Sequence, residues 1–238
     1  MGANMKDIKI ISATKGKEEN TIIHKSIEEY EYITEYGDNQ DYHLISGKII
    51  CNNIDSLAKV YNKEIEDGCN ENKILIFVHD DVIIEDLFLR EKLNEAMEQF
   101  DIVGLAGIKA PIAIKEPALW HLMGHPSQYS GAVAHFDKNE TQRFMTSFGK
   151  TPDRVVLLDG VFLAINTERI LKKGLRFDEN NPAKFHYYDL NFSLDANKLG
   201  LKLGTWPIWI THKSHGLEKP TEDWVNGQNY FLQKYGSK

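Results

Sequence analysis

Two carboxylates and an imidazole follow directly after a short apolar run in the first half of the sequence. The run is ILIFV, residues 74–78, and the three residues after it are His79, Asp80 and Asp81. Hard divalent cations prefer oxygen ligands, and Mg²⁺ is typically held by one or two carboxylates together with substrate phosphates. The pattern therefore indicates a divalent-cation site. The alternative is a pair of solvated aspartates, one of which caps a following helix.

A further carboxylate, Asp189, comes after the aromatic stretch PAKFHYY. Crowding by aromatic side chains raises the pKa of a carboxyl group and suits it to general-base catalysis. An Asp at the start of a helix is more often only an N-cap, so position alone favours the cap.

Histidines occur in two closely spaced pairs, His121 with His125 in HLMGH and His212 with His215 in HKSH. Such pairs are weak evidence for a metal, because most histidines are structural or exposed. The motifs HExxH, GxSxG, GxGxxG and the Walker loop are all missing from the sequence. Zinc hydrolases, serine hydrolases, P-loop proteins and dinucleotide-binding proteins are therefore unsupported.

The first half of the chain predicts alternating strands and helices around these groups. We expect strands at 9–13, 74–78 and 101–107 and helices at 55–68 and 89–100. Asp55 is expected to cap the first helix and Gly68 to end it. The uninterrupted apolar run at 74–78 fits a strand buried on both faces of a parallel sheet. This order predicts a layered α/β sheet with right-handed crossovers. The aromatic and charged segment 27–37 is left unassigned.

The second half is less regular. Residues 108–153 show little periodicity and are expected to form loops and short strands, whereas 154–166 is strand-like and broken at Asp159-Gly160. A helix is expected from Asp189, with Leu190, Leu194 and Leu199 inward and Gly200 closing it. In TWPIWITH, Trp206, Ile208, Ile210 and His212 alternate as on one face of a strand. A terminal helix is expected after Pro220.

Composition limits the classes of partner. The chain has 238 residues, 28 basic and 35 acidic, giving a net charge of −7, and no basic block offsets this balance. Nucleic-acid binding through phosphate contacts is therefore not expected. No apolar run approaches the ~18–20 residues of a membrane span. The start MGANMKDIKI lacks the apolar core of a signal peptide, and two cysteines are too few for a disulfide framework. We expect a cytoplasmic protein.

Four stretches together resemble the family-2-like inverting glycosyltransferases of GT-A fold, and more closely their prokaryotic branch linked to capsule and surface-polysaccharide synthesis. They are AKVYNKEIEDG with ILIFVHDDV, then DIVGLAG, then LLDGVFLAINTERI, and finally FHYYDLNFSLDANKLGLKLGTWPIWITHKSHG. The resemblance extends from about residue 7 to residue 216. It implies a single α/β domain over residues 1–238 with a mixed, mostly parallel sheet flanked by helices. The nucleotide-binding half is expected at about 7–107 and the acceptor and catalytic half at about 108–238.

The resemblance also implies a metal site. Asp81 matches the last acidic residue of the family's DxD-type metal motif, and His212 matches a late histidine of the metal or diphosphate site. His79 stands where many relatives have the first Asp, although imidazole can still ligate Mn²⁺. Asp80 is expected beside the nucleotide.

Other positions are assigned from the same resemblance. Asp189 matches the catalytic base, and Asp159 with Gly160 matches the acceptor-side pair. The nucleotide is expected against the end of the first strand, at Ser12, Ala13 and Thr14. Asn62 matches a helix position common in the family, with nucleotide binding and a purely structural role as the two alternatives.

The function implied is transfer of a sugar, with inversion, from a nucleoside diphosphate sugar to a hydroxyl of a saccharide or lipid-linked saccharide, with Mn²⁺ or Mg²⁺ as cofactor. Peripheral contact with a membrane is compatible with such an acceptor. Trp120, Trp206 and Tyr187 are candidate sugar-stacking aromatics, although each is more often a core residue. Two alternatives stay open. A sugar nucleotidyltransferase normally carries a Gly-rich basic signature, of which ATKGKEEN is a poor version, and His79 keeps a catalytically silent nucleotide- or sugar-binding module in view.

Overall fold

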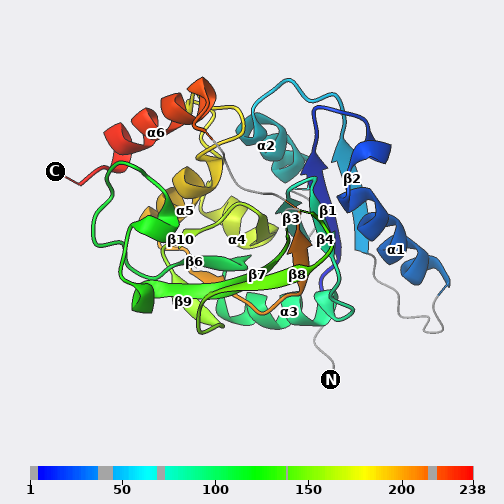
Figure 1. Ribbon diagram of the computed structural model, residues 1–238. Helices are drawn as coiled ribbons and strands as arrows, with labels where there is room; N and C mark the ends of the chain where they lie inside the picture. Colours follow the sequence, from blue (N-terminus) through cyan, green and yellow to red (C-terminus); the bar gives the residue numbers. More distant parts are fainter. Residues whose placement is uncertain (1–4, 37–44, 69–72, 138, 214–218, 238) are drawn as a thin grey trace.

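The computed structural model describes residues 5–36, 45–68, 73–137, 139–213 and 219–237 (Figure 1). Its larger sheet has seven strands in the order β2-β1-β3-β11-β5-β12-β9. The bounds are β1 Ile8–Ala13, β2 Ile45–Ile50, β3 Ile74–Val78, β5 Ile102–Gly104, β9 Asp153–Val155, β11 Phe162–Asn166 and β12 Leu203–Thr205.

The larger sheet is mixed, as expected from the sequence. Strand pairs β2–β1, β1–β3 and β5–β12 are parallel, whereas β3–β11, β11–β5 and β12–β9 are antiparallel. The sheet is therefore not mostly parallel, contrary to what the sequence led us to expect. Parallel and antiparallel pairs are equally frequent, because β11 runs antiparallel to both of its neighbours and β9 to β12. β3 is buried along its whole length, as its apolar run predicts.

A second sheet has the order β10-β6-β7-β13-β4, with β8 paired to β7. The bounds are β4 Val82–Ile84, β6 Ala106–Ile108, β7 Tyr129–Phe136, β8 Arg143–Gly149, β10 Leu157–Leu158 and β13 Ile210–His212. The expected strand 101–107 is divided at Leu105, so that β5 belongs to the larger sheet and β6 to the second. Gly131 makes this junction fit: its φ is +104°, and a Cβ there would lie 1.9 Å from the Leu105 carbonyl oxygen.

Helices and the second sheet cover both faces of the larger sheet. The helices are α1 Ile23–Tyr36, α2 Leu57–Asp67, α3 Leu89–Gln99, α4 Thr167–Lys172, α5 Tyr188–Lys198 and α6 Glu222–Tyr235, with 3₁₀ turns η1 Glu18–Asn20, η2 Trp120–Leu122 and η3 Pro126–Gln128. On β3, Leu75 and Phe77 pack into a core with α2, α4 and α5. Ile74, Ile76 and Val78 pack with α1, α3 and the second sheet. Within the described residues, no helix combines the length and the apolar composition that a membrane span requires.

The expected helices form, with corrected starts. Gly68 ends α2 as expected, but Ser56 and not Asp55 is its N-cap: the Ser56 hydroxyl accepts from the Lys59 backbone N–H, while Asp55 pairs with the Lys59 ammonium at 2.9 Å. The N-cap of α5 is Tyr187, in the left-handed region, so Asp189 lies inside the first turn and does not cap it.

The alternation in TWPIWITH is correct for burial but not for strand content. Trp206 and Ile208 are buried and Trp209 is 54% exposed, yet residues 206–209 lie between β12 and β13. Pro207 lacks a backbone N–H for a strand ladder, which accounts for the interruption. Leu199 is 39% exposed and not inward, because it follows the last residue of α5.

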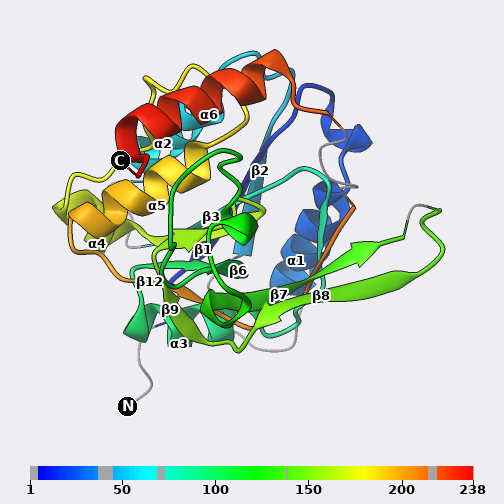
Figure 2. The ribbon, with the colours of Figure 1, turned by 60° about the vertical axis from the view of Figure 1, so that its left-hand side comes forward.

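Two regions left open by the sequence are regular. The unassigned segment 27–37 falls largely in α1. The aperiodic region 108–153 contains the long hairpin of β7 and β8, which extends away from the body of the molecule in Figure 2.

Candidate metal centre and catalytic cleft

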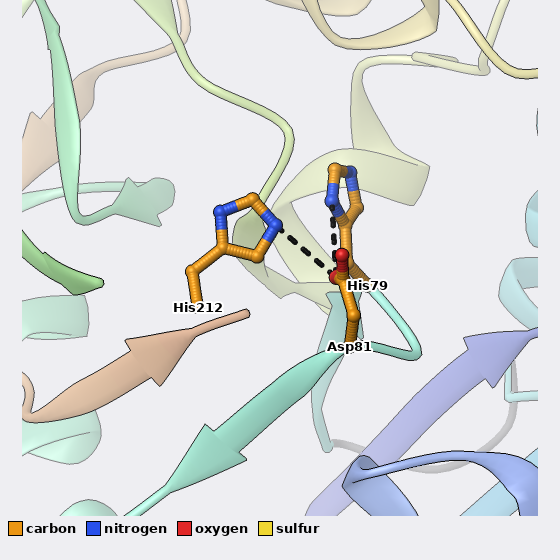
Figure 3. Close-up of side chains that lie close together, drawn as sticks. All are labelled: His79, Asp81 and His212. Carbon is orange, nitrogen blue, oxygen red and sulfur yellow. Dashed lines mark ion pairs between the residues drawn. The ribbon is translucent and has the colours of Figure 1, made fainter. Parts of the chain in front are cut away.

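His79, Asp81 and His212 come together where strands of the two sheets meet (Figure 3). His79 follows β3 and Asp81 precedes β4, while β13 pairs antiparallel with β4 so that His212 lies opposite Val82. The Asp81 Oδ1 atom is 3.1 Å from His212 Nε2 and 3.9 Å from His79 Nδ1. One ligand atom from each residue lies within 4.8 Å of the others.

These residues fit a divalent cation. Asp81 Oδ1 and His212 Nε2 are buried and, within the described part of the chain, neither has a partner in hydrogen-bond geometry although they face each other. Buried polar atoms normally have partners, and a cation bound between these two atoms would supply one to each. Two imidazoles and a carboxylate form a donor set that suits Mn²⁺ and related ions.

The surroundings of Asp81 and His79 favour the protonation states that bind a metal. Burial raises the pKa of the Asp81 carboxyl, but the interactions with His212 and His79 outweigh burial and leave this pKa below its ordinary value. Burial, together with the neighbouring His212, lowers the pKa of His79. An ionised carboxylate and a neutral imidazole are the forms that bind a cation.

A third histidine, His135 on β7, was not identified from the sequence. The centroid of its ring lies 5.7 Å from that of the His212 ring. The His135 ring also stacks on the ring of Phe144, with 5.6 Å between the two centroids. Burial lowers the pKa of His135, and His212 lowers it further. Only recognition of residues 129–136 as a strand beside 210–212 would have pointed to it.

A cleft of about 200 Å³ adjoins this cluster and shares His79 with it. Three other site candidates from the sequence, Asp159, Gly160 and Asp189, also line the cleft. The remaining wall is largely aromatic and imidazole, from Trp120, His121, Phe185, His186, Tyr187, Tyr188 and Trp224.

Asp189 is partly buried in the first turn of α5, with its carboxylate turned toward Gly160. The Gly160 backbone N–H donates to Asp189 Oδ2 at 2.8 Å. Burial and the negative charge of Asp159 raise the pKa of Asp189 to about 7, although backbone hydrogen bonds partly oppose the shift. A carboxyl with a pKa near neutrality is well suited to accept a proton at physiological pH.

Asp159 is fixed by two N–H donors. Trp120 Nε1 donates to Asp159 Oδ2 at 2.7 Å, and the Val161 backbone N–H donates to Oδ1 at 2.8 Å. The three candidate sugar-stacking aromatics, Trp120, Trp206 and Tyr187, are all buried. Trp120 and Tyr187 nevertheless contribute to the wall of the cleft. Trp206 packs against Phe100 in the core instead.

The residues assigned to the nucleotide lie outside the lining of the cleft. Ser12 on β1 is fully buried, and its hydroxyl has no hydrogen-bond partner within the described residues. Ala13 and Thr14 follow it, and the Thr14 hydroxyl accepts from the Gly16 N–H at 3.2 Å. The Asp80 carbonyl accepts from the N–H of Ile22 at 2.9 Å.

The side chain of Asn62 tethers α2 to the segment 177–179. Its amide oxygen accepts from the Phe177 N–H at 2.8 Å, and its amide nitrogen donates to the Phe177 carbonyl and the Glu179 carboxylate. Of the paired histidines, His125 caps η3, whereas His121 lines the cleft. His215 lies outside the described residues.

Comparison with known proteins bears on the fold and the family. In a search of solved structures, the crystal structure of GalNAc-T7 with UDP, GalNAc and Mn²⁺ matches with a TM-score of 0.53 and 11% identity, covering 98% of this chain and 48% of that one. The crystal structure of A197 from STIV matches with a TM-score of 0.46 and 12% identity, covering 91% and 98%. No curated protein sequence matches significantly.

The first of these matches confirms the expected GT-A fold, and this chain spans about half the length of that relative. The family described as "Glycosyltransferase like family" matches residues 26–235. This range includes His79, Asp81 and His212 and every residue that lines the cleft. The chain therefore belongs to this family of glycosyltransferases.

Proposed function

We propose that this protein is an inverting glycosyltransferase that uses Mn²⁺ or Mg²⁺ to transfer a sugar from a nucleoside diphosphate sugar to a hydroxyl of a saccharide or lipid-linked saccharide. One observation carries the proposal: His79 belongs to the cation-ligand cluster and also lines the cleft that holds Asp189. A group that neutralises a leaving diphosphate and a group that takes a proton from an acceptor thus adjoin a single cleft.

His79, Asp81 and His212 would hold the cation. When bound there, the cation would neutralise negative charge that develops on the leaving diphosphate. The nucleotide is proposed to lie against the end of β1, at Ser12, Ala13 and Thr14, with Asp80 beside it. Ala13 at the end of β1 is only half-buried, which supports this placement.

Asp189 is the proposed general base. The acceptor oxygen attacks the anomeric carbon as the bond from that carbon to the diphosphate breaks, and the hydroxyl proton moves to the Asp189 carboxylate. A single displacement from the opposite face inverts the anomeric configuration. The pKa of about 7 supports the role, because the carboxylate is then ionised often enough to act and basic enough to accept a proton.

Asp159 and Gly160 are proposed to border the acceptor, with Asp189 held against the Gly160 amide. The resemblance of the sequence to capsule-type transferases supports a role in surface-polysaccharide synthesis in the cytoplasm. UDP-sugars are the first donors to test, because the GalNAc-T7 structure contains UDP and Mn²⁺.

A donor screen tests the proposal without a known acceptor. Nucleoside diphosphate released by slow hydrolysis is measured for UDP-, GDP- and TDP-sugars, with Mn²⁺ and with EDTA. We expect release from one donor class in Mn²⁺ and little or none from that donor in EDTA. Metal-dependent nucleotide binding without turnover of any donor would favour a silent binding module instead.

A further inference from the structure

The hydroxyl group of Tyr188 connects the metal cluster to the peptide that holds the base. It lies 3.1 Å from His79 Nε2 and 2.9 Å from the Gly160 carbonyl oxygen. The side chain is 3% exposed, and its ring packs against Tyr61 and Phe177 in the aromatic core. The hydroxyl is therefore held in place by its own ring as well as by its partners.

The direction of these two hydrogen bonds follows from proton counting. A tyrosine hydroxyl has one proton, and a carbonyl oxygen can only accept, so the Tyr188 proton is donated to Gly160. The hydroxyl oxygen must then accept from His79, and Nε2 of His79 must carry the N–H. A neutral imidazole has one N–H, so Nδ1 keeps a free lone pair. Nδ1 is the His79 nitrogen that lies 3.9 Å from Asp81 Oδ1 (Figure 3).

We propose that Tyr188 is a positioning residue that fixes His79 in the tautomer protonated at Nε2, so that Nδ1 is the atom offered to the divalent cation. The inference rests on the cation site of the proposed function. Hydrogen-bond partners of this kind set the orientation and tautomer of metal-binding histidines, and their loss typically lowers metal affinity by about 10–100-fold.

Gly160 connects the two parts of the site through its two backbone polar groups, the carbonyl and the N–H. Its carbonyl accepts from Tyr188 and its N–H donates to Asp189, so one residue positions the metal ligand and the base. A Cβ at Gly160 would lie 2.5 Å from the Tyr188 hydroxyl and 2.9 Å from Asp189 Cβ. A side chain at this position would therefore displace the hydroxyl from His79.

The tautomer can be read directly in the metal-free protein. Long-range ¹H–¹⁵N NMR correlations report which imidazole nitrogen carries the proton, and the His79 signals are identified by their loss in His79→Asn. We expect protonation at Nε2 in the wild type. In Tyr188→Phe, His79 Nε2 loses the hydroxyl that accepts its proton, while the Asp81 carboxylate still lies near Nδ1. We therefore expect the proton to move to Nδ1, where it would occupy the lone pair needed to bind the cation.

Titration with Mn²⁺ alone measures the consequence. We expect the dissociation constant to rise by about 10–100-fold in Tyr188→Phe. Tyr30→Phe is the matched control, since Tyr30 is also buried and its hydroxyl donates to a backbone carbonyl, that of Asp86, at 2.7 Å. It should lose comparable stability and keep wild-type Mn²⁺ affinity.

The outcomes separate the two proposals. A wild type that does not bind Mn²⁺ would overturn the cation site and with it the ligand role of Nδ1. A wild type that binds Mn²⁺, with unchanged tautomer and affinity in Tyr188→Phe, would overturn this inference alone. Should Tyr188→Phe not fold, Gly160→Ala carries the same expectation, and an unchanged His79 tautomer in that variant would count against the role of Tyr188.

Discussion

The backbone N–H of Gly160 donates to Asp189 Oδ2 over 2.8 Å, although Gly160 directly follows Asp159, whose negative charge raises the pKa of Asp189. The dipeptide 159–160 thus acts on the proposed base in two opposite ways. The hydrogen bond stabilises the ionised carboxylate, and the neighbouring charge with burial destabilises it. Burial and charge prevail, which leaves the carboxyl group near half-ionisation at neutral pH.

Replacing Asp189 with Asn separates chemistry from binding. Asn keeps the shape of the side chain but cannot accept a proton at neutral pH, so we expect transfer to fall by about 10²–10⁴-fold. Mn²⁺-dependent affinity for the nucleoside diphosphate should stay within a few-fold of wild type, because the cation ligands are untouched. Steady-state transfer and calorimetric titration measure the two effects. A fully active Asp189→Asn would rule out the base.

The same variant should change stability in a pH-dependent way. The pKa of Asp189 is about 7 in the folded protein and ~3.9 when unfolded, so its contribution to stability is fully present below about pH 4 and is lost as pH rises through about 7. A shift of about three pH units corresponds to roughly 4 kcal/mol. We expect Asp189→Asn to be more stable than wild type at pH 8, with the difference shrinking toward pH 4 in urea denaturation.

The influence of Asp159 on the base can be measured from the pH dependence of transfer. The rate should rise with a midpoint set by Asp189 and level off above it. Removing the negative charge of Asp159 should move this midpoint to lower pH. We would make Asp159→Asn together with Trp120→Phe, since the indole N–H that donates to Asp159 would otherwise face the new amide.

Trp120→Phe alone is the control for that experiment. It keeps the charge of Asp159 and should leave the midpoint where it is in the wild type, even if the rate falls. A midpoint that is the same in the single and double variants would show that Asp159 does not set the pKa of Asp189.

Asp81→Ala should abolish the dependence of nucleotide binding on the cation. A diphosphate beside Asp80 and Asp81 is repelled in a partly dry cleft without an ion between them. UDP affinity in Mn²⁺ and in EDTA should therefore differ strongly in wild type and little in Asp81→Ala. His212→Ala should have a smaller effect, because water can replace an imidazole ligand.

Asp80→Ala provides the comparison within the same motif. Asp80 is not part of the three-residue ligand cluster in the described structure, so this variant should keep its response to Mn²⁺ even where nucleotide affinity drops. Equal UDP affinity in Mn²⁺ and EDTA for the wild type would contradict the cation requirement itself.

Local patterns in the sequence predicted the buried elements well. The run at 74–78 and the stripe of Leu89, Leu93 and Met97 describe elements whose apolar side chains all face a core, so periodicity alone identifies them. The hairpin of β7 and β8 was missed because β8 is mostly exposed and carries no alternation. It is held to β7 by backbone hydrogen bonds, which do not require particular side chains and so give no sequence pattern.

Local sequence patterns pointed to only part of the candidate site, and the family resemblance supplied further residues. His79, Asp80 and Asp81 stand out because they follow an apolar run, whereas only the family resemblance assigned His212 to the metal site. His135 meets His212 through the pairing of β7 with β13, and Tyr188 meets His79 because α5 packs beside the end of β3. Both contacts join residues about 80 to 110 positions apart in the sequence, which local patterns do not reveal. Likewise, Ser56 and Asp55 are both residue types that cap helices. Only the backbone geometry, which the sequence does not show, decides that Ser56 is the cap.

The position of β11 between β3 and β5 also bears on how the protein is made. A ribosome that has synthesised residues 1–108 has produced β3 and β5 but not the strand that joins them. Until residues 162–166 emerge, each of these two apolar strands has an unpaired edge, the kind of surface through which chains aggregate. The nascent first half is thus expected to need protection by chaperones, and cooperative folding to wait until about two thirds of the chain has left the exit tunnel.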